Sequence, residues 1–243
     1  MTDLFGSMGT FTVLAVGLLF GLKHATEVDH VVAVSTIASQ QRNVLRSALV
    51  GALWGAGHTA SLLIVGVLVL VLRIAIPESV SNWLEFGVAL MIIGLGAVAL
   101  WKSLKKRSDL HVHEHSHDGL SHVHVHFHES DTRHDSQQKK HSHAISAIGV
   151  KPVVIGMMHG LAGSGALTLL VLTQIPSAWI GVLYLGIFGV GSIAGMLLMS
   201  GLIGLPFALT ARNLSTVHHR MQLAAAVVSI VFGLWYAYET LGL

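Results

Sequence analysis

The densest group of potential metal ligands in this sequence is one short segment, Lys23–His30. It reads KHATEVDH and places two imidazoles and two carboxylates within seven residues. Imidazole nitrogen combined with one or two carboxylates suits nickel, cobalt, copper or zinc, and disfavours magnesium and calcium. The chain has no cysteine, so any metal must be held by nitrogen and oxygen. We predict a metal site here that uses His24, Asp29 and His30. Glu27 is a further candidate ligand.

A regular helix would not bring the three predicted ligands together. His24, Glu27 and His30 would share an arc of about 120°, whereas Asp29 would point elsewhere. A site that uses Asp29 therefore requires local unwinding of the helix, which is common at transporter sites. We expect Lys23 to pair with Glu27 four residues later, which would leave Asp29 free to bind metal.

Two further histidines, His58 and His159, lie in other apolar segments. They follow the basic residue at the start of their segments by 12 and 8 positions, respectively. Both, like His24, are thus expected near the middle of a hydrocarbon core about 30 Å thick. Taken alone, each is better explained by a hydrogen bond between helices. Together with Lys23–His30 they predict one intramembrane cluster, because ionisable groups at that depth are costly and seldom without function.

The elements that must position these residues are membrane helices. Of the 243 residues, 53% are hydrophobic and only 11% are charged, against about a quarter charged in an ordinary soluble domain. A membrane span needs about 20 apolar residues. Six runs are long enough, at roughly residues 10–38, 46–72, 83–101, 145–172, 179–202 and 221–241. We predict an all-α integral membrane protein with six transmembrane helices.

Basic residues predict how these helices are oriented, because Lys and Arg collect on cytoplasmic flanks. Twelve of them lie in the segments after the first, third and fifth runs, whereas Arg73 alone lies in the segments on the other side. This asymmetry places both termini outside the cell membrane and the long segment between the third and fourth runs in the cytoplasm.

Parts of the sequence recur at a constant distance. Gly21–His24 (GLKH) recurs as Gly156–His159 (GMMH) at an offset of 135, and Trp54–Ser61 (WGAGHTAS) recurs as Phe188–Gly195 (FGVGSIAG) at an offset of 134. Two matches at nearly one offset predict a duplicated unit of three helices. Because three is odd, the second copy must cross the membrane upside down. Transporters with such inverted repeats bind their substrate at the repeat interface.

The predicted loop, residues 102–144, separates the two repeats, which then cover residues 1–101 and 145–243. Eleven of the 17 histidines lie in this loop, between His111 and His143, many of them at alternate positions. We expect a flexible polar tract that binds borderline divalent cations weakly at many sites. The alternative is a solvated linker that binds metal only incidentally.

The spacing of His24, Asp29 and His30 resembles the H-x4-D-H signature of the nickel/cobalt permease family. KHATEVDH as a whole is similar to the family's R-H-A-x-D-A-D-H, and Ala56–Thr59 (AGHT) is similar to its later L-G-H-S/T element. The six predicted spans and His159–Ser164 (HGLAGS) look more like the shorter urease-accessory branch of that superfamily. The chain departs from the family pattern in having Lys for its Arg and Glu for its first Asp, and in lacking the D-T-x-x-E type element; family permeases usually have eight spans.

The resemblance implies passage of Ni(II) or Co(II), with His24, Asp29 and His30 essential and His58 contributing. No G-x-x-x-x-G-K-[ST] loop occurs, so we expect secondary transport without an ATPase on the same chain. Related resistance exporters also carry a His-rich cytoplasmic loop, so efflux is the alternative to the import that we favour. The expected partners are the ion, the bilayer, and cytoplasmic nickel chaperones or urease or hydrogenase maturation proteins. Neither nucleic acid nor a resident cofactor is expected.

Two other classes of function fit parts of the sequence. The spacing of His24, Glu27 and His30 suggests a membrane metalloenzyme such as a di-iron hydroxylase, but the further histidine clusters that such an enzyme needs are missing. A metal-buffering protein would use the His-rich loop and keep the helices only as an anchor. In that case the charges inside the membrane would be an unexplained cost.

Overall fold

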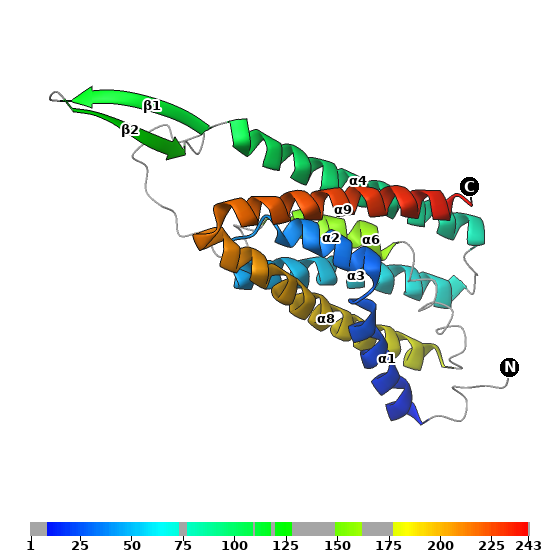
Figure 1. The fold of residues 1–243 in the computed structure, drawn as a ribbon. Helices are drawn as coiled ribbons and strands as arrows, with labels where there is room; N and C mark the ends of the chain where they lie inside the picture. Colours follow the sequence, from blue (N-terminus) through cyan, green and yellow to red (C-terminus); the bar gives the residue numbers. More distant parts are fainter. Residues whose placement is uncertain are drawn as a thin grey trace.

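The computed structural model describes residues 9–72, 77–108, 110–117, 120–127, 149–161 and 177–242. Its helices are α1 (Thr10–His24), α2 (Val28–Ala38), α3 (Val44–Leu72), α4 (Glu78–Ser108), α6 (Lys151–Gly160), α8 (Ala178–Asn213) and α9 (Ser215–Thr240). Its strands are β1 (Leu110–His117) and β2 (Leu120–Phe127). Figure 1 shows the helices gathered in one bundle, with the two strands extending beyond it.

Within the described residues, four helices are long and apolar enough to cross a membrane: α3, α4, α8 and α9. The helices α1 and α2 add a fifth span if the pair, bent by 52° at a short break, crosses as one. The membrane protein predicted from composition is thereby confirmed. The fourth predicted run, 145–172, is represented by α6, and its last part lies outside the described residues. The count of six spans therefore stays a prediction.

The helices of the two halves of the chain pack against each other. α3 packs on α8, α4 on α9, α1 on α8 and α3 on α6. The short helix α2 contacts α3, α4, α8 and α9, and it lies among them in Figure 1. The larger hydrophobic cluster joins these elements through buried side chains such as Val34, Trp54, Ile92 and Met196. The centre of the bundle is thus built around α2 and α3, the helices that carry His30 and His58.

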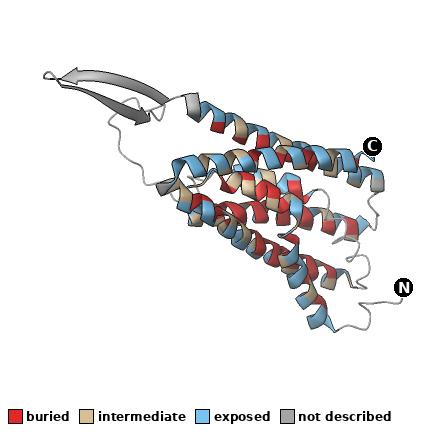
Figure 2. Cartoon of the chain, viewed as in Figure 1, coloured by how far each residue is buried: buried red, intermediate tan, exposed pale blue. Residues whose placement is uncertain are grey.

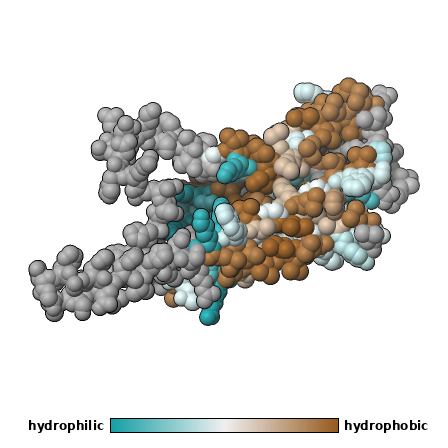
Figure 3. Space-filling model, turned by 90° about the horizontal axis from the view of Figure 1, so that it is seen from above, coloured by the Kyte–Doolittle hydropathy of each residue, from teal (hydrophilic) through white to brown (hydrophobic). Residues whose placement is uncertain are grey.

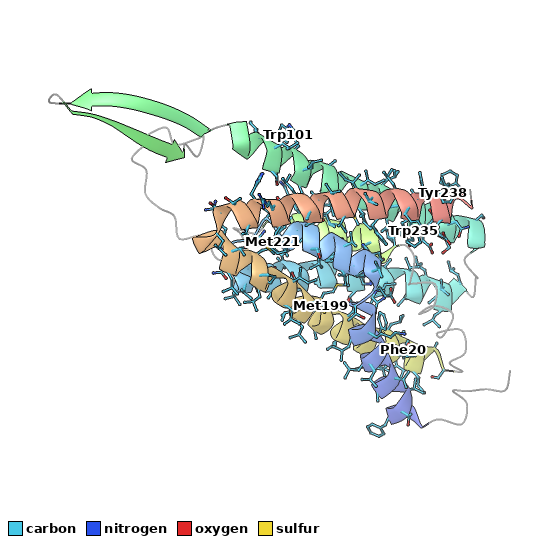
Figure 4. All side chains as sticks on the ribbon, in the orientation of Figure 1. Phe20, Trp101, Met199, Met221, Trp235 and Tyr238 are labelled. Atoms are coloured by element: carbon cyan, nitrogen blue, oxygen red, sulfur yellow. The ribbon has the colours of Figure 1, made fainter. Side chains whose placement is uncertain are left out.

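The outer surface of the bundle is apolar. In Figure 2, buried residues line the facing sides of α3 and α8, whereas few residues of α9 are buried. Figure 3 shows hydrophobic residues over most of the described surface in view and hydrophilic ones gathered toward one end. Exposed Trp101 lies near one end of the bundle, and exposed Trp235 and Tyr238 lie near the other (Figure 4). Aromatic residues at both ends of an apolar surface are typical of the two membrane interfaces.

The chain is unwound where the candidate ligands are densest. α1 ends and α2 begins on either side of Ala25–Glu27. Within this break, Thr26 Oγ1 donates a hydrogen bond to the carbonyl of Lys23 at 2.6 Å, and the backbone at Glu27 is extended, with φ −64° and ψ 148°. The break confirms the local unwinding that a site with Asp29 requires.

Part of the predicted His-rich loop, residues 102–144 (the His-rich segment), has regular structure. α4 continues to Ser108, past the predicted boundary at residue 102, and β1 and β2 form an antiparallel pair. The register sets three pairs of histidines opposite each other: His111 and His126, His113 and His124, His115 and His122. The two strands were not expected in this flexible polar tract, although histidines at alternate positions match the period of a strand. Residues 128–144 lie outside the described part of the chain.

Candidate metal site

Four helices converge on one buried cluster of imidazoles. His24 is the last residue of α1, His30 lies in the first turn of α2, His58 lies in α3 and His159 lies near the end of α6. None of these four residues is more than 3% exposed. Asp29 joins them from α2, with its side chain 16% exposed. The structure thus brings together all the histidines that sequence analysis placed inside the membrane.

The first group within the cluster consists of His24, His30 and His58. Nε2 of His24 lies 2.9 Å from Nε2 of His58, and the ring centroids of His24 and His30 are 4.4 Å apart. Each residue offers one ligand atom, and these atoms all lie within 4.8 Å of one another. Two ligands at right angles, each about 2.1 Å from a metal ion, are about 3 Å apart. The separation of the His24 and His58 nitrogens therefore suits two ligands of one ion.

The second group consists of Asp29, His30 and His159. The Asp29 carboxylate lies between the two imidazoles: Oδ1 is 3.0 Å from Nδ1 of His30, and Oδ2 is 2.8 Å from Nε2 of His159. The ligand atoms of this group also lie within 4.8 Å of one another. Because a carboxylate only accepts hydrogen bonds, each imidazole donates to it. His30 belongs to both groups.

Glu27 lies at the edge of the cluster and outside both groups. Its Oε2 atom is 3.1 Å from Nδ1 of His24, and its side chain is 36% exposed. The expected pairing of Glu27 with Lys23 is wrong, because the helix breaks between them and the four-residue helical spacing no longer brings them together. A carboxylate on Nδ1 fixes the proton there and keeps the lone pair of His24 on Nε2, which accepts a hydrogen bond from Nε2 of His58 and can bind a metal in its place. A carboxylate in this position is common behind metal-binding histidines.

Three buried imidazole nitrogens of the cluster have no hydrogen-bond partner among the described residues. They are Nε2 of His30, Nδ1 of His58 and Nδ1 of His159. A buried polar atom left unpaired costs about 1–3 kcal/mol. Nε2 of His30 is moreover the lone-pair nitrogen, because Nδ1 donates to Asp29. Such a nitrogen can bind a metal cation through its lone pair, and the bond to the metal replaces the missing hydrogen bond.

Aromatic side chains enclose the imidazoles. Trp54 stacks on His30 with ring centroids 5.5 Å apart, and it packs edge-on against His159 with ring centroids 5.3 Å apart. Phe188 lies 5.5 Å from the ring of His24. Sequence analysis did not identify Trp54 as a site residue. It precedes His58 by four positions, which places both on one helix face, and this spacing could have indicated it.

These features define a class of protein: a multi-pass helical membrane protein with an imidazole–carboxylate site between its helices. Comparison with known proteins narrows the class. No protein-family model and no solved structure matches the chain. The urease accessory protein UreH of Bacillus sp. (strain TB-90) is 40% identical over 235 residues, which cover 94% of this chain and 91% of that protein. The chain belongs to the family of this urease accessory protein, and the predicted urease-accessory branch is thereby confirmed.

More distant relatives come from a plant. The chloroplast proteins FOR GROWTH AND FERTILITY 1 and 2 of Arabidopsis thaliana are 26% and 27% identical over 228 and 207 residues. These matches cover 93% and 85% of this chain but only 59% and 50% of the two plant proteins. The placement of the chain in the larger nickel/cobalt permease superfamily stays a prediction.

Proposed function

We propose that the chain is a secondary transporter that imports Ni(II), or Co(II), through the buried cluster. The observation that carries the proposal is the convergence of four buried imidazoles and one carboxylate, with three imidazole nitrogens unpaired. His24, His30 and His58 are proposed as ligands from imidazole nitrogen. Asp29 and His159 complete the cluster, and Glu27 orients His24.

The donor set determines which ions fit. Imidazole nitrogens with a single carboxylate favour nickel, cobalt, copper and zinc, and are unsuited to magnesium and calcium, which prefer oxygen ligands. The relative from Bacillus is a urease accessory protein. This favours nickel among these ions, because urease is a nickel enzyme, and it favours import, because an accessory protein would supply the metal. Cytoplasmic nickel chaperones or urease maturation proteins would then receive the ion.

The packing supports the inverted repeat of residues 1–101 and 145–243. A side chain at Gly21 would collide with the backbone carbonyl of Phe188, and one at Gly156 would collide with that of Trp54. The sequence offsets relate Gly21 to Gly156 and Trp54 to Phe188, so one contact repeats the other. A second contact repeats in the same way, Gly57 on the carbonyl of Val153 and Gly191 on that of Leu18. We therefore propose that the two halves are related by a pseudo-twofold axis in the membrane plane, as in other transporters with inverted repeats.

The His-rich segment is proposed to collect metal on the cytoplasmic side, with both termini outside. In Figure 1 the strands β1 and β2 extend from the end of α4, and the C-terminal end of α9 lies at the other end of the bundle. The antiparallel register sets three histidine pairs opposite each other along β1 and β2. Eleven histidines between His111 and His143 supply many imidazole nitrogens in one stretch of chain, so this segment suits a buffer for imported ions.

The test is accumulation of radiolabelled nickel in cells that express the chain, compared with cells that do not. The proposal expects more cell-associated nickel with the parent chain and the empty-vector level with His24→Ala. His219→Ala is the matched control, because it also removes an imidazole but lies at the start of α9, outside the cluster. Lower nickel content together with better nickel tolerance would show export and contradict import. Equal content in all cells would contradict transport.

A further inference from the structure

His30 is shared by the two groups of ligands. Its ring centroid lies 4.4 Å from that of His24 and 4.1 Å from that of His159. We infer that the cluster holds one ion at a time in two alternating positions, and that His30 hands the ion from His24 and His58 to Asp29 and His159, or back. This inference rests on the proposed function and describes how the same site works.

The repeat makes the two positions equivalent in part. The offset of 135 relates His24 to His159, and the offset of 134 relates Trp54 to Phe188. His24 lies beside the ring of Phe188, and His159 lies beside the ring of Trp54, so the two contacts correspond in the repeat. The ring of His30 is nearly equidistant from these two histidines. The offset of 135 places Gly165, which has no side chain, at the position of the second half that corresponds to His30. A single imidazole therefore serves both halves, and no second copy of it exists.

The two nitrogens of His30 face different groups. Nδ1 donates to Asp29 at 3.0 Å, and Nε2 is buried without a partner among the described residues. A neutral imidazole carries one proton and one lone pair. In the first position Nε2 binds the ion beside His24 and His58, and the proton stays on Nδ1. In the second position Nδ1 binds the ion beside the Asp29 carboxylate, and the proton moves to Nε2.

Proton and charge balance allow the exchange. His30 changes tautomer and neither gains nor loses a proton. His159 does the same in the second position: its proton moves from Nε2, which then binds the ion, to Nδ1, which is unpaired among the described residues. In the first position the proton shared by the Nε2 atoms of His24 and His58 moves to Nδ1 of His58, which is likewise unpaired there, so that both Nε2 atoms can bind the ion. Because His30 has only one lone pair, filling one position empties the other. The first position offers three nitrogens, and the second offers two nitrogens and a carboxylate oxygen, so their cobalt spectra must differ.

The test uses Co(II) as the probe and the purified full-length chain in detergent, with the eleven loop histidines between His111 and His143 changed to glutamine to remove binding there. Equilibrium dialysis measures the number of Co(II) ions per chain, and visible absorption reports the ligand set. The parent is expected to bind one ion. His30→Gln is expected to lose binding, with affinity lower by about 100-fold or more.

Two variants separate the positions. His159→Gln is expected to keep one Co(II), with affinity within a few-fold of the parent and the spectrum of a three-nitrogen site. His58→Gln is expected to keep one Co(II) with the spectrum of a site that includes a carboxylate. Both are expected to lower cobalt uptake into proteoliposomes by about tenfold or more, because each removes one of the two positions between which the ion must move. His159→Asn and His58→Asn repeat the measurement if either glutamine variant fails to elute as folded protein.

Three results would overturn the inference. Two Co(II) ions bound per parent chain would mean independent sites. Loss of binding in both His58→Gln and His159→Gln, as complete as in His30→Gln, would mean one site that needs all the ligands. Uptake by His159→Gln at the parent rate would mean that the second position is not on the path. A parent that neither binds nor takes up cobalt would instead contradict the proposed function itself, and the inference with it.

Discussion

Asp29 joins α2 to α6, because its Oδ2 atom accepts a hydrogen bond from Nε2 of His159 at 2.8 Å. The two residues are 130 positions apart in the sequence and belong to different halves of the chain. The other carboxylate oxygen of Asp29, Oδ1, accepts a hydrogen bond from Nδ1 of His30 at 3.0 Å. One carboxylate thus orients an imidazole from each half, and it supplies the negative charge closest to the buried nitrogens.

The first prediction concerns that charge. Asp29→Asn keeps the volume of the side chain and one acceptor oxygen, but it removes the charge and replaces the second acceptor with a donor. Initial uptake of radiolabelled nickel should fall by about 10- to 100-fold, at equal protein level in the membrane. Glu85→Gln is the matched control, because it neutralises a carboxylate of α4 that lies outside both ligand groups. Uptake by Asp29→Asn equal to that of the control would exclude a role for this charge in transport.

The second prediction concerns the carboxylate behind His24. Glu27→Gln weakens the hydrogen bond that holds the proton of His24 on Nδ1, so Nε2 becomes a poorer ligand. The apparent KM for nickel should rise by about tenfold while the maximal rate stays within a few-fold of the parent. Lys23→Met is the matched control, because Glu27 pairs with His24 and not with Lys23. A fall in KM for Lys23→Met as large as the rise for Glu27→Gln would show that surface charge and not His24 is responsible, because the two variants change the net charge in opposite directions.

Residue types and spacing were sufficient to predict which residues of α1 and α2 enter the cluster. KHATEVDH contains the donors in one stretch, and the need to use Asp29 predicted the break that the structure shows over Ala25–Glu27. The same break explains the wrong pairing of Lys23 with Glu27, which assumed an unbroken helix. Local sequence thus indicated which residues would come together, but the pairing within the segment depended on where the helix ends.

Contacts between distant segments could not be predicted from spacing. The sequence placed His58 and His159 at a similar depth in the membrane, but a shared depth does not determine which side chains are in contact. The contact between His159 and Asp29 depends on the packing of α6 on α3 and of α2 on its neighbours. The shared position of His30 follows from the same packing. The hairpin of β1 and β2, by contrast, was indicated by the alternating histidines and was missed because the segment was expected to be a flexible polar tract.

The third prediction tests the close approach of the repeats. Gly57 and Gly191 lie against the backbone carbonyls of Val153 and Leu18, so a side chain at either position must push helices apart. Gly57→Leu and Gly191→Leu should each lower nickel uptake and the melting temperature in detergent, because overpacking a close contact typically costs about 1–3 kcal/mol or more. Gly94→Leu is the matched control, since nothing lies within 4 Å of a Cβ there. Wild-type behaviour of both variants would contradict the symmetric interface.

The fourth prediction concerns the His-rich segment. Changing the eleven histidines between His111 and His143 to glutamine should leave initial nickel uptake and the maximal rate within a few-fold of the parent, because the segment lies outside the buried cluster. Retention of nickel after a chase with unlabelled metal should fall, because the cytoplasmic buffer is lost. A raised KM for cytoplasmic nickel with normal retention would indicate a collector that feeds export. Loss of all flux at saturating nickel would place the segment on the conduction path.

The central claim is that the transported ion is bound by the buried imidazoles, and X-ray absorption at the nickel edge tests it most directly. The sample is the full-length chain with glutamine in place of the loop histidines, loaded with one equivalent of Ni(II). The account predicts scattering from at least two imidazoles in this protein and its loss in His30→Gln, with His219→Gln unchanged. Nickel surrounded by oxygen alone, or an identical spectrum in His30→Gln, would contradict it.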